Sequence, residues 1–106
     1  MPIPKPGNPV RGSQTGRPIM VALDLLGRRG ALRILWELRS DGLTFRALQD
    51  AAQTNPGLLN TRLKELRATG LVVHAGDGYQ LTASGRELLG AMHTLQDWAV
   101  RWAAQL

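Results

Sequence analysis

Two stretches decide the fold: NPGLLNTRLKELRATGLV at residues 55–72 and YQLTASGREL at residues 79–88. In the first stretch, Asn55 can cap a helix, and Pro56 suits the first helical position because a helix start does not use the N–H that proline lacks. Gly70 stands where the residue after a helix often takes a left-handed conformation. These signals predict a helix at about residues 56–69.

This predicted helix has an apolar and a polar face. Leu59, Leu63 and Leu66 recur at spacings of four and three, which brings them to one side of a helix. The polar candidates for the outward side are Asn55, Gly57, Asn60, Thr61, Arg62 and Lys64. We expect the leucines to enter the core and the polar residues to meet solvent or a partner.

Beyond Gly70 the hydrophobic period changes from 3.6 to 2, as expected for strands. Residues 71–74 and 79–81 have the composition of short strands, and Gly76–Asp77–Gly78 between them is a tight-turn signal. The sequence therefore predicts a β-hairpin over about residues 71–81.

The last predicted helix, at about residues 83–104, carries an apolar seam. Its cap is Thr82 or Ser84, and Ser84 followed by Glu87 has the capping-box pattern. The seam is spaced 4-3-4-3-4, as in helices that pair, and Trp98 widens it; it consists of Leu88, Met92, Leu95, Ala99, Trp102 and Leu106. The two tryptophans are candidates either for plain packing or for lining an effector pocket.

Three shorter helices precede the helix at 56–69. They are expected at residues 19–27, at 31–39 and from a cap at Thr44 onward. Their inward residues should be Met20, Leu23 and Leu26, then Leu32, Leu35 and Trp36 joined by Ile34 and Leu38, then Phe45, Leu48 and Ala52. The carboxylates of Asp24, Glu37 and Asp50 are expected to face solvent.

The predicted element order is that of a winged helix-turn-helix domain. The fold class is mainly α with a small β-hairpin, in one domain over residues 19–106. The helix at 56–69 takes the place of the recognition helix, which enters the major groove of B-DNA in such folds. Asn can pair with adenine there, and Arg or Lys can contact guanine or phosphate. Asn55 can equally be only a cap, and Arg62 and Lys64 only a solvated face.

Composition narrows the function. The 106 residues carry a net charge of +5 and no cysteine, which excludes disulfides, cysteine-ligated zinc and thiol chemistry. A basic small helical chain favours nucleic acid as a partner. Two histidines do not make a metal site, and no cofactor is indicated. No stretch is long and apolar enough to span a bilayer and no signal sequence is visible, so we expect a cytoplasmic protein.

Residues 1–18 hold five of the six prolines and the basic residues Lys5, Arg11 and Arg17, with no acidic residue. We predict a disordered arm, which either contacts DNA or is an extension without a role. Weaker candidates for contacts to the DNA backbone are Arg17, Arg28, Arg29, Thr44 and Arg46. Arg28 and Arg29 could instead only cover the end of the first helix.

Taken together, residues 17–98 resemble the HxlR-type winged-helix transcriptional regulators, which are related to the MarR group. The similar stretches are PIMVALDLLG at 18–27, ALRILWEL at 31–38 and LTFRALQDA at 43–51, followed by the two quoted above. The resemblance implies a homodimer joined by its first and last helices, and two recognition helices in successive major grooves. It also implies control of a nearby operon, sometimes under a small effector. The interface candidates are Leu23, Leu88, Met92, Leu95, Trp98, Ala99 and Trp102.

Several residues depart from the family pattern. Arg17 stands where many members carry a sensor cysteine, so thiol sensing is excluded. Arg28 and Arg29 replace Gly-Lys, and Gly30 replaces a tryptophan, whose space Trp36 is expected to fill. Gly57 replaces a polar residue. The wing is short, with Asp77 at its tip in place of the family's arginine, so we do not expect it to read the minor groove.

Two other readings compete with sequence-specific DNA binding. The acidic wing tip and the tryptophan-rich last helix also suit a winged-helix module that binds another protein. An architectural protein that binds DNA without sequence preference is the third possibility, and a steep salt dependence without a preferred site would mark it. No catalytic motif is present: there is no Gly-rich phosphate loop, no Ser-His-Asp order and no HExxH, so we do not expect an enzyme.

Overall fold

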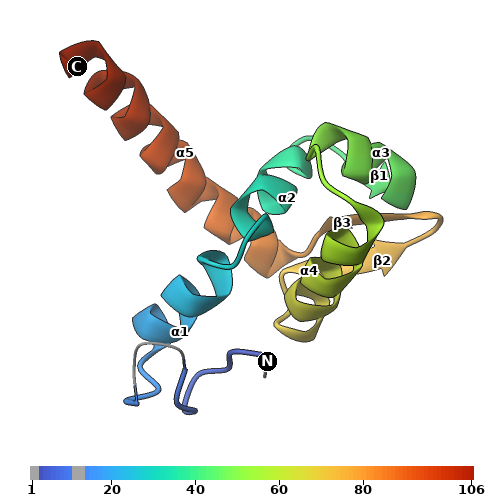
Figure 1. Cartoon of the computed structure of the whole chain (residues 1–106), viewed down its shortest axis with the longest axis horizontal. Helices are drawn as coiled ribbons and strands as arrows, with labels where there is room; N and C mark the ends of the chain where they lie inside the picture. The colour runs from blue at the N-terminus through green and yellow to red at the C-terminus, as the bar shows by residue number, and fades with distance from the viewer. Residues whose placement is uncertain (1–2, 11–13) are drawn as a thin grey trace.

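A computed structural model describes residues 3–10 and 14–106 of the chain. Its elements follow the order helix, helix, strand, helix, helix, strand, strand, helix (Figure 1). They are α1 (Pro18–Leu26), α2 (Ala31–Glu37), β1 (Leu43–Thr44), α3 (Phe45–Ala51), α4 (Pro56–Ala68), β2 (Val72–Ala75), β3 (Gly78–Leu81) and α5 (Ala83–Gln105). The predicted winged helix-turn-helix order is therefore confirmed, and α4 occupies the position that the sequence analysis assigned to a recognition helix.

The helix starts follow from short polar side chains that accept hydrogen bonds from free backbone N–H groups. The Asn55 side chain accepts from the Leu58 N–H at 2.8 Å, and Thr44 Oγ1 accepts from Ala47 at 3.1 Å. At α5 the cap is Thr82, whose Oγ1 accepts from Gly85 at 3.1 Å, so the Ser84 alternative is wrong. After α4, Gly70 takes the predicted left-handed conformation, with φ +78°.

The strands form one antiparallel sheet in the order β1-β3-β2. Val72 pairs with Leu81 and Ala75 with Gly78, which leaves a two-residue turn at Gly76 and Asp77. Gly76 has φ +60°, as the first central residue of a type II′ hairpin turn requires. The two-residue strand β1 pairs with β3 and anchors the hairpin, the wing, to the body of the domain.

One core joins the helices to the sheet. Leucines of α2, α3 and α4 meet Val72 and Leu81, and the deepest residues are Ile34, Leu35, Leu38, Leu48, Leu59 and Leu66. The predicted inward stripes of α3 and α4 are confirmed here. In α1, however, Leu23 is 57% exposed, while Val21 and Leu25 are buried in its place. Leu32 in α2 is also exposed, whereas Leu35, Ile34 and Leu38 of the same predicted face are buried. Gly30 lies beside Leu58 and Ile34, so Trp36 does not fill its space.

Helix α5 begins against the core and then leaves it. Leu89 is buried, but the C-terminal half projects away from the domain (Figure 1). Its exposed apolar side chains include Leu95, Trp98, Val100 and Trp102. A helix with such a face unpartnered is typical of a chain that binds a second protein surface. In the described part of the chain, no helix is both long and apolar enough to cross a membrane.

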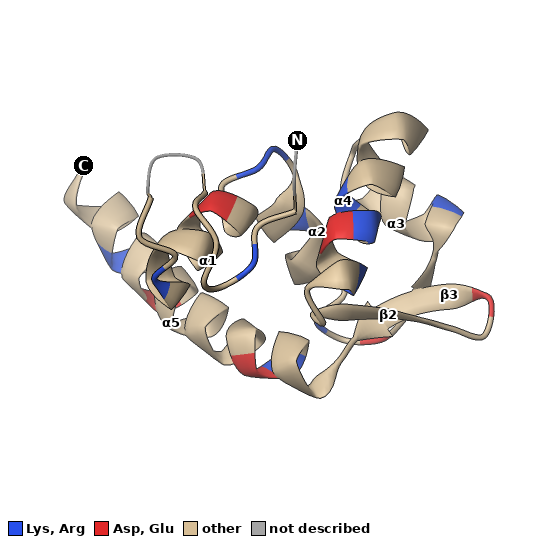
Figure 2. Cartoon of the chain, turned by 90° about the horizontal axis from the view of Figure 1, so that it is seen from below, with Lys and Arg blue, Asp and Glu red and all other residues tan. Residues whose placement is uncertain are grey.

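Residues 3–10 and 14–17 run beside α1 (Figure 2). The Gly7 N–H donates to the Gly16 carbonyl at 2.9 Å, and Pro4 is buried. Arg17 is the exposed N-cap residue of α1, and Arg11 lies outside the described residues.

The close approach of α5 to the loop before β2 yields a stability prediction. A Cβ at Gly85 would clash with the Leu71 carbonyl oxygen, whereas a Cβ at Gly90 on the same helix meets nothing within 4 Å. Gly85→Ala should therefore destabilise the domain by about 1–3 kcal/mol, and the control Gly90→Ala should stabilise it by about 0.5–1 kcal/mol. Urea denaturation of both variants measures the difference, and equal effects would contradict this packing.

Candidate DNA-binding surface

The outward face of α4 is polar and open to solvent. Gly57, Asn60, Thr61 and Lys64 are all exposed, and they follow one another at helical spacing. The structure adds Arg67, which is exposed on the last turn and which the sequence analysis left out. Arg67 follows Lys64 by three positions, and residues three apart lie on the same side of a helix, so the sequence could have placed Arg67 on this face.

The first turn of α4 is accessible to a ligand's backbone or phosphate groups. A Cβ at Gly57 would have only Asn55 Oδ1 as a neighbour, at 3.4 Å, so the surface there is open. Asn55 itself is exposed but serves as the cap, and Thr61 Oγ1 donates to the Gly57 carbonyl at 3.0 Å. Asn60 and Lys64 have no hydrogen-bond or ion-pair partner among the described residues, so their polar groups are available to a ligand.

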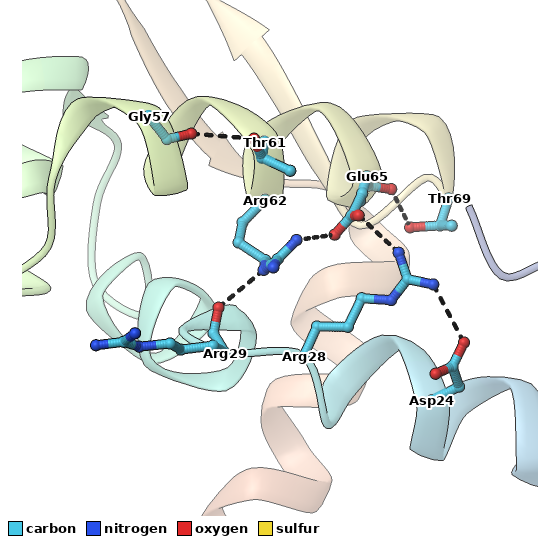
Figure 3. Close-up of polar contacts among 8 residues, drawn as sticks. All are labelled: Asp24, Arg28, Arg29, Gly57, Thr61, Arg62, Glu65 and Thr69. Carbon is cyan, nitrogen blue, oxygen red and sulfur yellow. Dashed lines mark hydrogen bonds and ion pairs between the residues drawn. The ribbon is translucent and has the colours of Figure 1, made fainter. Parts of the chain in front are cut away.

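Arg62 does not join this face. Its Nε donates to the Arg29 carbonyl at 2.8 Å, and its guanidinium pairs with Glu65 Oε1 at 2.7 Å (Figure 3). Only 15% of the side chain is exposed. Contrary to the expected outward position, Arg62 occupies the helix side that faces the loop between α1 and α2, where its guanidinium is engaged within the domain.

Arg28 also lies inside the domain, which favours the predicted alternative that it covers the end of α1. It is 7% exposed, and its guanidinium contacts Glu65 Oε2 at 2.6 Å and Asp24 Oδ2 at 3.3 Å. Asp24, which was predicted to face solvent, is likewise buried. Neither charge is presented to a DNA backbone, because each neutralises the other inside the domain.

These contacts form one network across three segments (Figure 3). Asp24 belongs to α1, Arg28 and Arg29 to the loop after it, and Arg62 and Glu65 to α4. Both oxygens of the Glu65 carboxylate are paired with guanidinium groups. A buried charge is tolerated only when it is paired and hydrogen-bonded, so this network holds α4 at a defined position relative to α1.

The weaker candidates occupy different surfaces. Arg29 is exposed, and Thr44 is exposed while its hydroxyl caps α3. Arg46 is 85% exposed and lies 3.8 Å from Asp50, whose predicted exposure is confirmed. Glu37 is partly buried and pairs with Arg33 at 2.9 Å. Basic residues are spread over α2, α3, α4, α5, the loop before α2 and the segment before α1, while the hairpin tip carries only the acidic Asp77 (Figure 2).

The wing offers no cationic side chain at its tip. Asp77 occupies the exposed turn, and His74 stacks on Tyr79 with ring centroids 4.5 Å apart. A carboxylate repels phosphate, so this hairpin does not supply the cationic contact that the sequence comparison with the family would suggest.

The predicted interface residues gather on α1 and α5. Leu23, Leu95, Trp98 and Trp102 are each about half exposed, and the two tryptophan rings stack with centroids 5.5 Å apart. An apolar groove of about 300 Å³ lies beside them, lined by residues of α1, α2 and α5 that include Leu23, Leu88, Met92 and Leu95. Ala99 is half-buried on the same helix.

The HxlR-like helix-turn-helix family matches residues 25–106, which span the recognition helix, the wing and the last helix. The chain belongs to the HxlR-like helix-turn-helix family. A relative in Methanocaldococcus jannaschii, an uncharacterised helix-turn-helix-type transcriptional regulator, is 26% identical over 83 residues, or 74% of this chain and 78% of that protein.

Solved structures of similar proteins share the fold of this HxlR-like chain. Quinone-bound YodB from B. subtilis is 27% identical with a TM-score of 0.74, covering 78% of this chain and 96% of YodB. NolR from Sinorhizobium fredii is 25% identical with a TM-score of 0.60, covering 70% and 79%. Reduced HlyU from Vibrio cholerae, at 23% identity and a TM-score of 0.59 over 73% and 86%, supports the fold alone.

The network around Glu65 makes a second stability prediction. Glu65→Gln leaves two guanidinium groups without their shared carboxylate, so the free energy of unfolding should fall by about 3 kcal/mol. Asp50→Asn removes an exposed pair instead and should cost less than about 0.5 kcal/mol. Chemical denaturation measures the free energy of unfolding of both variants. A Glu65→Gln variant as stable as Asp50→Asn would show that the network does not stabilise the domain.

Proposed function

We propose that this chain is a cytoplasmic, sequence-specific DNA-binding transcription regulator that acts as a homodimer with α4 in the major groove. The observation that carries the proposal is the outward face of α4. Asn60 and Lys64 are exposed there without a partner among the described residues, although the same helix satisfies its inward-facing charges within the domain. Membership of a helix-turn-helix family supports the same conclusion.

The face divides into base-reading and phosphate-binding groups. Asn60 is the residue suited to pair bidentately with a base, because an amide presents a donor and an acceptor side by side. Lys64 and Arg67 supply positive charge for phosphate oxygens, and the open first turn at Gly57 lets backbone N–H groups approach a phosphate. Arg29, from the loop beside α4, and the exposed Thr44 and Arg46 provide further backbone contacts.

The homodimer is supported by the apolar face on α1 and α5. Monomeric proteins rarely leave several large apolar side chains exposed together, and a two-fold axis along these helices would bury them on both copies. The same symmetry would present two recognition helices to half-sites one helical turn apart.

Selection of random DNA fragments by the full chain at physiological salt tests sequence-specific binding. We expect enrichment of a pseudo-palindrome whose half-sites lie about one helical turn apart. Enrichment of nothing, together with a steep salt dependence, would favour the architectural alternative. Absence of DNA binding altogether would favour a protein-binding module built on the acidic wing and the apolar α5.

Variants on the α4 face test the division of roles on the selected site. Asn60→Ala should relax specificity at one base pair and weaken binding by about 1–3 kcal/mol. Lys64→Gln should weaken all sequences alike and lower the salt slope by about 1. Arg101→Gln on α5 is the matched charge control, and it should leave the slope unchanged; a slope that falls equally in both variants would contradict the assignment.

Leu95→Glu tests the homodimer. Leu95 is 53% exposed, so the substitution is tolerated in a monomer but places a charge in the proposed interface. Light scattering after size-exclusion chromatography should show a dimer for the wild type and a monomer for the variant. Glu87→Gln, elsewhere on α5, is expected to stay dimeric, and a monomeric wild type would refute the proposed assembly.

A further inference from the structure

A second cavity adjoins the groove at Leu23, with which it shares Leu26 and Leu88 as lining residues. Its volume is about 480 Å³, and its walls come from the arm, from α1, from the end of α4 and from the start of α5. Most of the lining is apolar: Pro4, Pro6, Pro18, Val21, Ala22, Leu25, Leu26, Leu71 and Leu88. A cavity of this size and character falls within the range that holds small organic ligands.

The remaining lining residues give the cavity a polar edge. They are Thr69, Ser84 and Glu87. Thr69 already donates its hydroxyl to carbonyls of α4, at 2.8 Å to Glu65 and 3.3 Å to Leu66. The free polar groups at this edge therefore come from α5.

Ser84 and Glu87 are available because of how α5 starts. Their spacing is that of a capping box, but Thr82 caps the helix and accepts the Gly85 N–H. Among the described residues, neither the Ser84 hydroxyl nor the Glu87 carboxylate has a hydrogen-bond or ion-pair partner. The pair lies one turn apart on the same side of α5, at the edge of an apolar cavity.

We propose that this cavity binds a small amphiphilic amine, whose apolar ring or chain fills the space between α1 and Leu71 and whose ammonium group meets Glu87 and Ser84. The carboxylate supplies the negative charge, and the serine hydroxyl accepts a second N–H of the ammonium. Apolar walls favour the organic body of the ligand over a bare metal ion or an inorganic cation.

The position of the site connects it to the rest of the domain. It contacts α1, which carries part of the proposed dimer face, and the last turn of the recognition helix through Thr69. Binding of the amine does not depend on DNA binding, so the two proposals can fail separately.

Isothermal titration of the full chain with three matched ligands tests the site. The probes are 4-phenylbutylamine, 4-phenylbutanol and 4-phenylbutyrate, which share an apolar body and differ in charge. The amine should bind about fivefold or more tightly than the alcohol, because only it forms a charge-assisted contact with Glu87, and the carboxylate should bind least. Equal affinity for the three probes, or no saturable binding, would overturn the proposal.

Two variants locate the binding. Glu87→Gln keeps the shape of an exposed side chain and should bring the amine's affinity down to that of the alcohol, while Asp97→Asn on the same helix should change nothing. Ala22→Phe fills the cavity and should abolish binding of all three probes, with thermal denaturation as the check that the variant is folded. An amine preference that survives Glu87→Gln would place the ammonium elsewhere. A change of oligomeric state in Ala22→Phe would show that a second copy, not a ligand, covers the cavity.

Discussion

The contact between Arg28 and the carboxylate of Glu65 determines how the recognition helix sits in this domain. The two residues are 37 positions apart, and their ion pair joins the loop after α1 to the middle of α4. Asp24 and Arg62 complete the charge balance on either side. Because a buried guanidinium without a carboxylate is costly by several kcal/mol, α4 cannot rotate or slide without breaking the whole network.

The fixed position of α4 explains how one helix can pack against the domain on one side and present a polar face for a ligand on the other. Arg62 and Glu65 point toward the body of the domain, so the opposite side of α4 is left with Asn60, Lys64 and Arg67 for a ligand. The ionic network also connects α4 to α1, and Leu23 of α1 belongs to the proposed dimer face.

Local signals predicted the elements, but not the partners of the charged side chains. The cap at Asn55, the left-handed Gly70 and the leucines of α4 each depend on neighbours within one turn, so the sequence suffices. Arg28 and Arg62 read as surface charges because Arg28 pairs with Glu65, 37 positions away, and Arg62 donates to the Arg29 carbonyl, 33 positions away, and only the fold brings these segments together. The local pairs Asp24–Arg28 and Arg62–Glu65 have helical spacing, but the sequence does not show that they are buried. The sequence also did not decide between Thr82 and Ser84 as the N-cap of α5, because both residues carry a hydroxyl that can cap a helix.

The central claim is that two copies of α4 stand one turn of DNA apart. The chain has no cysteine, so Ala68→Cys, at the exposed C-terminal end of α4, gives one unique site for a spin label on each copy and leaves the proposed base-reading residue Asn60 unchanged. Double electron–electron resonance should then show one narrow distance of about 34–36 Å when the labelled protein is bound to its selected DNA, matching successive major grooves. Absence of a dipolar signal, or a distance well below that spacing, would contradict the account.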